Sequence, residues 1–241
     1  MNQLHEEILK IAPGCADASG RLGVHDTFRV LMDMAAIHAE MIGVGFADMA
    51  KRGLFWLTVK TKVNFLERPR LGEQVTLRTW PEAPERVRGC RSYQVLRGGE
   101  TVITGKTEWA VINVETGRLV PLKGVYPEEL ELSLPTAVEE PFSRLADDFS
   151  EEELAMNYRV ASTDIDVGRH MNNSAYVRAL MGAFSNAELA GVSVRSMEVI
   201  FKAPCFEGDE LAVFRRRTDT GWDMKMSRAD ETVILARIVC E

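Results

Sequence analysis

Two stretches of hydrophobic positions at helical spacing divide the chain. Apolar residues recur every three or four positions from Phe28 to Ile42 and again from Tyr176 to Leu189, which predicts one long helix in each region. Segments rich in β-branched and aromatic residues, such as Phe55–Phe65, follow the first helix and predict strands. Each half therefore consists of a long helix followed by several strands. This order indicates an α+β fold in which an antiparallel sheet wraps around each apolar helix.

The strand regions repeat within the chain. Residues 63–75 align without a gap with residues 199–211, and each segment predicts a strand, a turn at Gly72 or Gly208, and a second strand. Further along, Glu-Thr-Val-Ile occurs at 100–103 and again at 231–234, each time after a polar turn, which is typical of a hairpin. The two halves are thus copies of one unit.

The segment between these units has a different composition. Residues 119–150 carry four prolines among many acidic residues, which suits a connector and not the interior of a sheet. We expect short helices at 125–130 and 150–154, and two domains at residues 1–140 and 141–241. The methionines Met32, Met34, Met41 and Met49 are expected on the first helix, either as ordinary core or as the wall of an adaptable tunnel.

Composition and charge exclude several classes of protein. The net charge is −7, which argues against nucleic acid as the main partner. The chain begins with acidic residues where a signal peptide would be basic, and it has no apolar stretch of membrane-spanning length, so we expect a cytoplasmic protein. Its four cysteines are scattered without a CxxC pair, so neither a metal ion nor another cofactor is expected.

Arginines gather in two places despite the acidic total. We expect them to form either solvated strand faces or a docking surface for an acidic protein or a phosphorylated carrier arm. The first group has seven members and the second has three: Arg68, Arg70, Arg78, Arg86, Arg88, Arg91 and Arg97, then Arg215, Arg216 and Arg217.

The most polar segment, residues 158–176, lies directly before the second helix. Asp166 and His170 are four residues apart, so this carboxylate and imidazole could polarise a water molecule or a thiol. Asn172 or Asn173 is expected to cap the helix, whose first N–H groups could stabilise an oxyanion. The alternative is that these residues only form a turn and a helix cap. His25, two residues after Gly23, echoes Gly168 and His170 and would be a core or surface histidine, or a remnant of an ancestral site.

Residues 164–176 resemble the signature D-x-D-x-N-x-H-x-N-N-x-x-Y of the acyl-ACP thioesterases of plants and bacteria. The first half is also similar to that family at residues 26–29, 55–57 and 78–81, so the resemblance covers nearly the whole chain. It implies tandem hot-dog domains, with the acyl chain bound mainly in the N-terminal half and hydrolysis carried out by the C-terminal half. The implied catalytic pair is Asp166 and His170.

Two positions depart from the family pattern. Gly168 stands where the family has Asn, and Pro204 precedes Cys205 where plant members have Glu. Glu198, Glu207 and Asn172 are candidate substitutes for the missing polar groups. Cys205 is either a nucleophile activated by His170 or a small buried side chain beside the site.

The sequence therefore predicts a thioesterase that releases a free fatty acid from acyl carrier protein during fatty acid biosynthesis. Its candidate catalytic residues are Asp166, His170, Asn172 and Cys205. Two alternatives stay open: a non-catalytic protein that binds acyl groups or acyl carrier protein, and an acyl-CoA thioesterase or hydratase of the same fold. Chain length, the preference for carrier protein over coenzyme A, and assembly into a homodimer also stay open.

Overall fold

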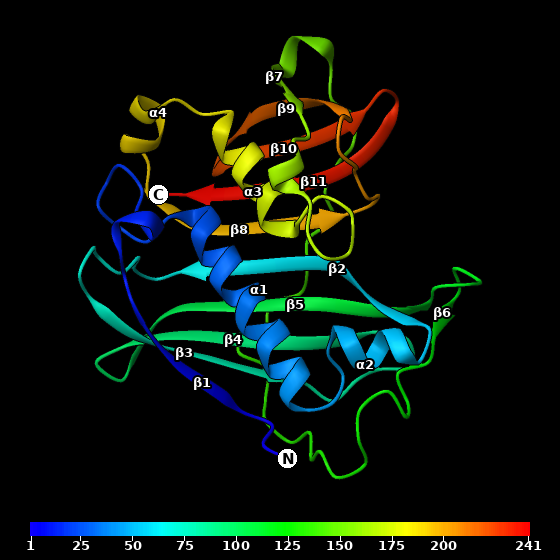
Figure 1. The fold of residues 1–241 in the computed structure, drawn as a ribbon. Helices are drawn as coiled ribbons and strands as arrows, with labels where there is room; N and C mark the ends of the chain where they lie inside the picture. The colour runs from blue at the N-terminus through cyan, green and yellow to red at the C-terminus, as the bar shows by residue number, and fades with distance from the viewer.

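A single antiparallel sheet forms the body of the protein, and helices cover one of its faces (Figure 1). This computed structural model describes residues 1–241. The helices are α1 (Val24–Met41), α2 (Phe46–Lys51), α3 (Asn173–Gly182) and α4 (Asn186–Ala190), with short 3₁₀ turns η1 (Pro13–Cys15), η2 (Glu151–Glu153) and η3 (Ser162–Asp164). The strands are β1 (His5–Lys10), β2 (Leu54–Phe65), β3 (Gln74–Pro81), β4 (Gly89–Arg97), β5 (Glu100–Asn113), β6 (Leu119–Val120), β7 (Leu154–Arg159), β8 (Val194–Phe201), β9 (Glu210–Thr218), β10 (Gly221–Arg228) and β11 (Glu231–Cys240).

The strand order shows that the two halves are copies. It runs β1-β3-β4-β5-β2-β8-β11-β10-β9-β7, with the short β6 paired to β5. Read from either edge to the centre, this order is the same, because β7 takes the place of β1, β9 of β3, β10 of β4, β11 of β5 and β8 of β2. The halves join where β2 pairs with β8, with Lys62 opposite Glu198. The predicted α+β architecture is confirmed.

One hydrophobic core runs through both halves. A cluster of 36 buried residues joins α1 and the N-terminal strands to α3 and the C-terminal strands. At the seam, Val63 and Met197 lie opposite each other in β2 and β8 and are both fully buried. A second cluster of 7 buried residues lies only in the N-terminal half, where α2 and the start of the connector cover the sheet. The halves therefore share a core, so removing either half would expose buried apolar residues of the other to water.

The strand turns predicted at Gly72 and Gly208 are present. Both glycines have a left-handed backbone, with φ of 87° and 89°, a conformation that glycine adopts without steric cost. Each also donates its N–H to the carbonyl of the residue just after an edge strand. Gly72 donates to Ile11, which follows β1, and Gly208 donates to Val160, which follows β7. The matching hydrogen bonds establish that the repeat extends to backbone geometry.

The second helical region differs from the single helix predicted. Helix α3 ends at Gly182, and a separate short helix, α4, begins after Ser185, whose side chain accepts a hydrogen bond from the N–H of Glu188. This cap starts a new helix where the apolar spacing alone suggested continuity. The prediction of Met49 on the first helix is also wrong, because Met49 lies in α2.

The connector runs along the face of the sheet opposite to the helices. Trp80 donates its indole N–H to the carbonyl of Pro135, and Lys106 donates to the carbonyl of Val138 at 2.6 Å. The ring of Phe142 then covers the ammonium groups of Lys60 and Lys106. Residues 125–130 form turns instead of the predicted helix, whereas η2 forms within the second predicted segment. These contacts attach the connector to β2, β3 and β5 of the N-terminal half.

Candidate active site

The loop between η3 and α3 folds back on itself through hydrogen bonds centred on Asp166. The backbone N–H of Arg169 donates to the Asp166 carbonyl at 2.9 Å, and the N–H of Gly168 donates to the Asp166 carboxylate at 2.8 Å. Arg169 has a left-handed backbone with φ of 62°, which is uncommon for a residue with a side chain. This tight loop turns the side chains of Asp166 and His170 toward each other.

Asp166 and His170 form a loosely spaced pair. Their nearest atoms, His170 Nδ1 and Asp166 Oδ1, are 3.9 Å apart, and both side chains are about one quarter exposed, at 26% and 27%. Nδ1 lies 3.3 Å from the carbonyl of Met171, so it carries the proton and donates to that oxygen. The Nε2 atom is then the unprotonated nitrogen. The site thus pairs an unprotonated imidazole nitrogen with a carboxylate close enough to stabilise the protonated ring.

The start of α3 lies directly beside this pair. Asn172 caps the helix, because its Oδ1 accepts hydrogen bonds from the N–H and the hydroxyl of Ser174 at 2.8 and 2.7 Å. Its amide nitrogen lies 3.4 Å from Asp166 Oδ2. The backbone N–H of Asn173, the first residue of α3, makes no hydrogen bond within the protein. A free N–H at the positive end of a helix is suited to binding a developing oxyanion.

The N-terminal half supplies the opposite wall of the site. The amide nitrogen of Asn173 donates to the hydroxyl of Thr58 on β2 at 2.7 Å. The ring of Phe55, also on β2, meets the His170 ring edge to face, with centroids 5.8 Å apart. Sequence reasoning did not predict a role for Thr58 or Phe55, since both lie more than 100 residues before the loop. Only the pairing of the halves brings them to the site.

The other polar candidates lie elsewhere. Glu198 is buried on the opposite face of the sheet, where it accepts hydrogen bonds from the N–H and hydroxyl of Ser143 in the connector. Glu207 is exposed and makes no hydrogen bond. Neither glutamate takes the place of the Glu that plant members of the family have where this chain has Pro204. Of the three candidate substitutes, only Asn172 lies at the site.

Cys205 lies in the core under the site. Its side chain is fully buried, and burial raises the pKa of its thiol. Its backbone N–H donates to the hydroxyl of Tyr176 at 2.8 Å, and its carbonyl accepts from Met171. No hydrogen bond joins it to His170. A buried thiol with a raised pKa is a poor nucleophile, so this environment favours the alternative that Cys205 is a small core residue.

A second loop in the N-terminal half has the same hydrogen bonds as the first. The N–H of Gly20 donates to the Asp17 carbonyl and that of Ser19 to the Asp17 carboxylate, both at 2.9 Å. Gly20, with φ of 70°, matches the left-handed Arg169. By this correspondence, Asp17 occupies the place of Asp166, Arg21 that of His170 and Gly23 that of Asn172.

His25 is therefore not the counterpart of His170. It lies inside α1, with its Nε2 atom 3.2 Å from the carboxylate of Asp26. The N-terminal loop has kept the acid but lacks both the imidazole and the capping amide. Only the C-terminal copy retains all three side chains.

The two arginine groups are largely neutralised by ion pairs. Arg68 pairs with Asp17, Arg78 with Glu6 and Arg88 with Glu108, while Arg97 contacts Glu67 and Glu73. In the second group, Arg215 pairs with Glu188 and Arg216 with Asp148 and Glu153, while Arg217 lies over the ring of Trp222. Most of these arginines thus have acidic partners within the chain, and both predictions for them, solvated strand faces and a docking surface, stay predictions.

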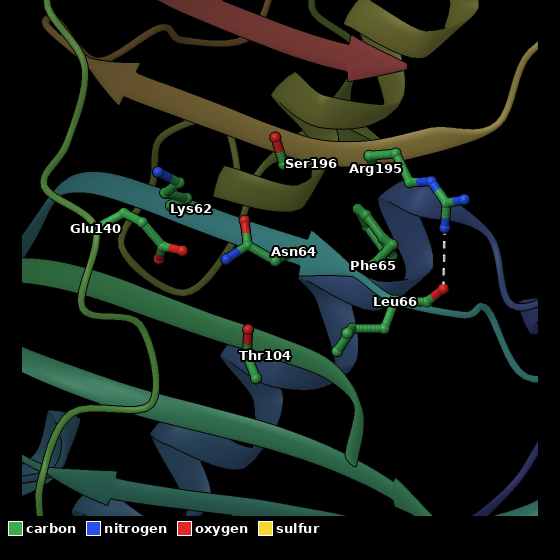
Figure 2. A pocket seen from close by; sticks show the side chains of 8 residues that line it. All are labelled: Lys62, Asn64, Phe65, Leu66, Thr104, Glu140, Arg195 and Ser196. Atoms are coloured by element: carbon green, nitrogen blue, oxygen red, sulfur yellow. Dashed lines mark hydrogen bonds between the residues drawn. The ribbon is translucent and has the colours of Figure 1, made fainter. Parts of the chain in front are cut away.

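One surface depression lies apart from Asp166 and His170. It measures about 570 Å³ and lies over the seam between β2 and β8, on the face opposite to the helices (Figure 2). Polar side chains of Lys62, Asn64, Glu140 and Ser196 surround it, and Arg195 donates to the carbonyl of Leu66 at one end. Its polar lining does not suit an acyl chain.

The structure contains no group of three or more His, Cys, Asp or Glu side chains arranged to hold a metal ion. No helix has the length and apolar character that crossing a membrane requires.

Comparison with solved structures defines the class of fold. An acyl-ACP thioesterase from Bacteroides thetaiotaomicron is 21% identical and superposes with a TM-score of 0.87, covering 99% of this chain and 98% of the other. A 12:0-ACP thioesterase from Umbellularia californica is 16% identical, with a TM-score of 0.86 and coverage of 100% and 98%. The predicted tandem hot-dog fold is confirmed.

Family models identify the chain more closely. The acyl-ACP thioesterase N-terminal domain matches residues 2–129, and the acyl-ACP thioesterase C-terminal domain matches residues 148–235. The chain belongs to the acyl-ACP thioesterase family. The chloroplastic oleoyl-acyl carrier protein thioesterase of Coriandrum sativum is 22% identical over 199 residues, which cover 75% of this chain and 53% of that protein. The chain thus spans about half the length of the curated relatives it matches.

Proposed function

We propose that the protein hydrolyses a fatty acyl thioester of acyl carrier protein, releasing the free fatty acid and the carrier thiol. The observation that carries this proposal is the Asp166–His170 pair beside the free N–H of Asn173 at the start of α3. Thioester hydrolysis requires a base and an oxyanion donor close together, and here they lie three residues apart in one short segment. Membership of the family supports the same reaction.

Water is the proposed nucleophile. His170 Nε2 removes a proton as the water oxygen attacks the thioester carbonyl, and Asp166 stabilises the resulting imidazolium. The N–H of Asn173 and the dipole of α3 stabilise the oxyanion. When the tetrahedral intermediate collapses, the C–S bond breaks and the imidazolium returns its proton to the leaving thiolate. Every proton moves through His170, and Cys205 takes no part.

The two halves have different proposed roles. Residues 141–241 carry the catalytic loop, and residues 1–140 bind the acyl chain along the face of the sheet that α1 covers. Acyl carrier protein as the donor fits the names of the relatives, which include oleoyl- and palmitoyl-acyl carrier protein thioesterases. The cytoplasmic location and the homodimer stay predictions.

Hydrolysis of a panel of acyl-ACP and acyl-CoA substrates, followed by thiol release, tests the proposal. We expect turnover to fall by about 100-fold or more in His170→Ala and in Asp166→Asn, because each removes part of the proton-transfer system. Cys205→Ala is the control, and it is expected to keep most of the wild-type turnover.

The panel also separates the alternatives. Turnover that survives both substitutions would contradict the proposed mechanism. Tight binding of acyl-ACP without turnover would favour the non-catalytic binding protein, while faster turnover of acyl-CoA would favour an acyl-CoA thioesterase. Hydration of an unsaturated acyl thioester without thiol release would identify a hydratase.

A further inference from the structure

The N-terminal half has polar side chains on the face of the sheet that the proposed function gives to the acyl chain. Thr61 on β2 and Thr107 on β5 lie opposite each other, both buried, with their hydroxyl oxygens 3.1 Å apart. Trp109, two residues further along β5, lies opposite Thr58 on β2. Thr58 is the residue that contacts Asn173, so this polar region begins at the catalytic loop.

Two donors in this region have no partner. The hydroxyl of Tyr93 on β4 and the indole N–H of Trp109 are buried and make no hydrogen bond. Tyr93 is 0% exposed, and its hydroxyl faces Thr107 and Trp109 without hydrogen-bond geometry to either. Burial raises the pKa of Tyr93 to about 12, so the phenol keeps its proton and stays a donor. An unpartnered buried donor is costly, which makes two neighbouring ones unusual.

A buried cation lies next to these donors. Arg91 on β4, opposite Thr107, is 5% exposed, and it donates to Nδ1 of His38 at 3.0 Å and to the hydroxyl of Thr79 at 3.3 Å. No carboxylate lies within ion-pair distance of its guanidinium group. Arginine and tryptophan can only donate, so the indole N–H of Trp109 needs an acceptor that the protein does not place in hydrogen-bond geometry.

We propose that this region selects an acyl chain that carries an acceptor oxygen, as a hydroxyl or oxo group, on one of the first carbons after the thioester. The inference rests on the proposed hydrolase function and adds the class of substrate. Tyr93 and Trp109 donate to this oxygen, and the charge of Arg91 makes the region more favourable for it. An unsubstituted chain leaves both donors unpaired, so it is the poorer substrate.

The position of the oxygen follows from the strand register. Directly paired residues in an antiparallel sheet have α-carbons about 5 Å apart, so Trp109 is one strand away from the Thr58 contact with the catalytic loop. Trp56 and Trp109 are half-buried and meet edge to face at 6.3 Å, next to that contact. The oxygen must therefore lie close to the thioester and not at the far end of the chain.

Matched substrates of one chain length test the inference. We would compare kcat/KM for 3-hydroxyacyl-, 3-oxoacyl-, terminally hydroxylated and unsubstituted acyl-ACP. Calorimetry would give the Kd of the free 3-hydroxy, terminally hydroxylated and unsubstituted acids, which are stable in solution. We expect the wild type to favour the 3-hydroxy or 3-oxo chain over the unsubstituted chain by at least about tenfold. The preferred member of the 3-hydroxy and 3-oxo pair shows whether the acceptor oxygen belongs to a hydroxyl or to an oxo group.

Two variants report on the unpartnered donors. Tyr93→Phe removes only the hydroxyl, and Trp109→Phe removes the indole N–H. Each should reduce the preference for the oxygenated chain by about tenfold at most. Trp222→Phe is the control, because Trp222 packs against Phe184 in the other half and should leave the preference unchanged.

Equal kcat/KM and equal Kd for oxygenated and unsubstituted chains would overturn the inference, as would a preference that both variants retain. A preference for the terminally hydroxylated chain would overturn it too. If no thioester is hydrolysed, the proposed function fails, and the Kd values alone then decide the inference. The two failures are therefore distinguishable.

Discussion

Gly168 stands at a point in the catalytic loop that has little room for a side chain. A Cβ atom added there would lie 2.9 Å from His170 Nε2, 3.0 Å from Asp166 Oδ1 and 3.2 Å from the Phe55 ring. The asparagine of the family pattern therefore cannot enter this loop unless His170 moves. The departure from the family pattern lets His170, Asp166 and Phe55 approach one another more closely.

Gly168→Ala should reduce kcat by about 10- to 100-fold, because the new methyl group displaces His170 and small misplacements of catalytic groups are costly. The melting temperature should change little, since the loop is at the surface. Thiol-release kinetics and thermal denaturation measure the two effects. Gly14→Ala is a matched control, as nothing lies within 4 Å of the added methyl group. Wild-type kcat in Gly168→Ala would contradict the crowding argument.

Residue types and local spacing were sufficient to predict that Asp166, His170 and Asn172 lie together, because hydrogen bonds within one short loop join them. Thr58 and Phe55 were not predicted, since their approach depends on how β2 is placed against the loop of the other half. For Cys205, the sequence predicted either a nucleophile or a small buried side chain, and the structure shows that the side chain is buried. Local hydrogen bonding is thus readable from sequence, and contact across the halves is not.

At the scale of elements, the start of α3 combines a structural role with a proposed catalytic one. Asn172→Ala removes the cap, which should lower the free energy of unfolding by about 1 kcal/mol. It should also reduce kcat, because the helix end that presents the N–H of Asn173 becomes less fixed. Denaturant unfolding and thiol-release kinetics measure the two quantities.

Ser185→Ala provides the comparison, since Ser185 caps α4 in the same way but contacts no site residue. It is expected to lower stability by up to about 1 kcal/mol with unchanged kcat. Equal kinetic effects of the two cap substitutions would show that α3 acts on catalysis only through overall stability.

Helix α1 contacts the sheet through a buried histidine that is neutral in the fold. Burial, and then the nearby charge of Arg91, lower the pKa of His38 to about 4. Since the unfolded chain has a histidine pKa of about 6.5, the stabilisation is present above pH 6.5 and is lost as pH falls toward 4. It amounts to at most about 3 kcal/mol.

His38→Gln should flatten the pH dependence of the melting temperature between pH 7 and pH 4. A glutamine can accept from Arg91 and donate to the carbonyl of Asn2, as His38 does, but it does not titrate. Thermal melts of both proteins across this range measure the difference. Parallel curves would assign the acid sensitivity to other groups.

Elements with a strong periodic pattern were predicted, and those set by single polar residues were not. The strand β2 and the hairpins before β5 and β11 follow from apolar runs and polar turns. The break between α3 and α4 depends on the cap at Ser185, and the edge strands β1 and β7 are short with alternating half-buried positions. A weak pattern becomes a strand only when the neighbouring strand is present.

At the scale of the whole molecule, the site depends on the docking of the two halves. Thr58→Val removes the hydroxyl that accepts the hydrogen bond from the Asn173 amide, while the valine side chain keeps a similar shape. We expect kcat to fall by about tenfold, because a lost hydrogen bond loosens the residue that carries the oxyanion donor. Thr58→Ser retains the hydroxyl and should restore most of the rate. Unchanged kinetics in Thr58→Val would limit the site to the C-terminal half.

The duplicated architecture was predictable because sequence similarity between 63–75 and 199–211 survives in the strands that form the core. The joining of both sheets through β2 and β8, and the shared core beneath them, were not, since pairing between distant strands leaves no local pattern. The roles given to residues 1–140 and 141–241 stay predictions that the variants above can test.

The two loops around Asp17 and Asp166 also have an evolutionary consequence. In a homodimer of single hot-dog units, one gene specifies both copies, so every substitution appears in both loops at once. In this chain the copies are encoded separately. One loop could therefore replace its histidine with Arg21 and its capping amide with Gly23 while the other kept both. Separate encoding thus allows one half to take the proposed binding role while the other half keeps the proposed catalytic side chains.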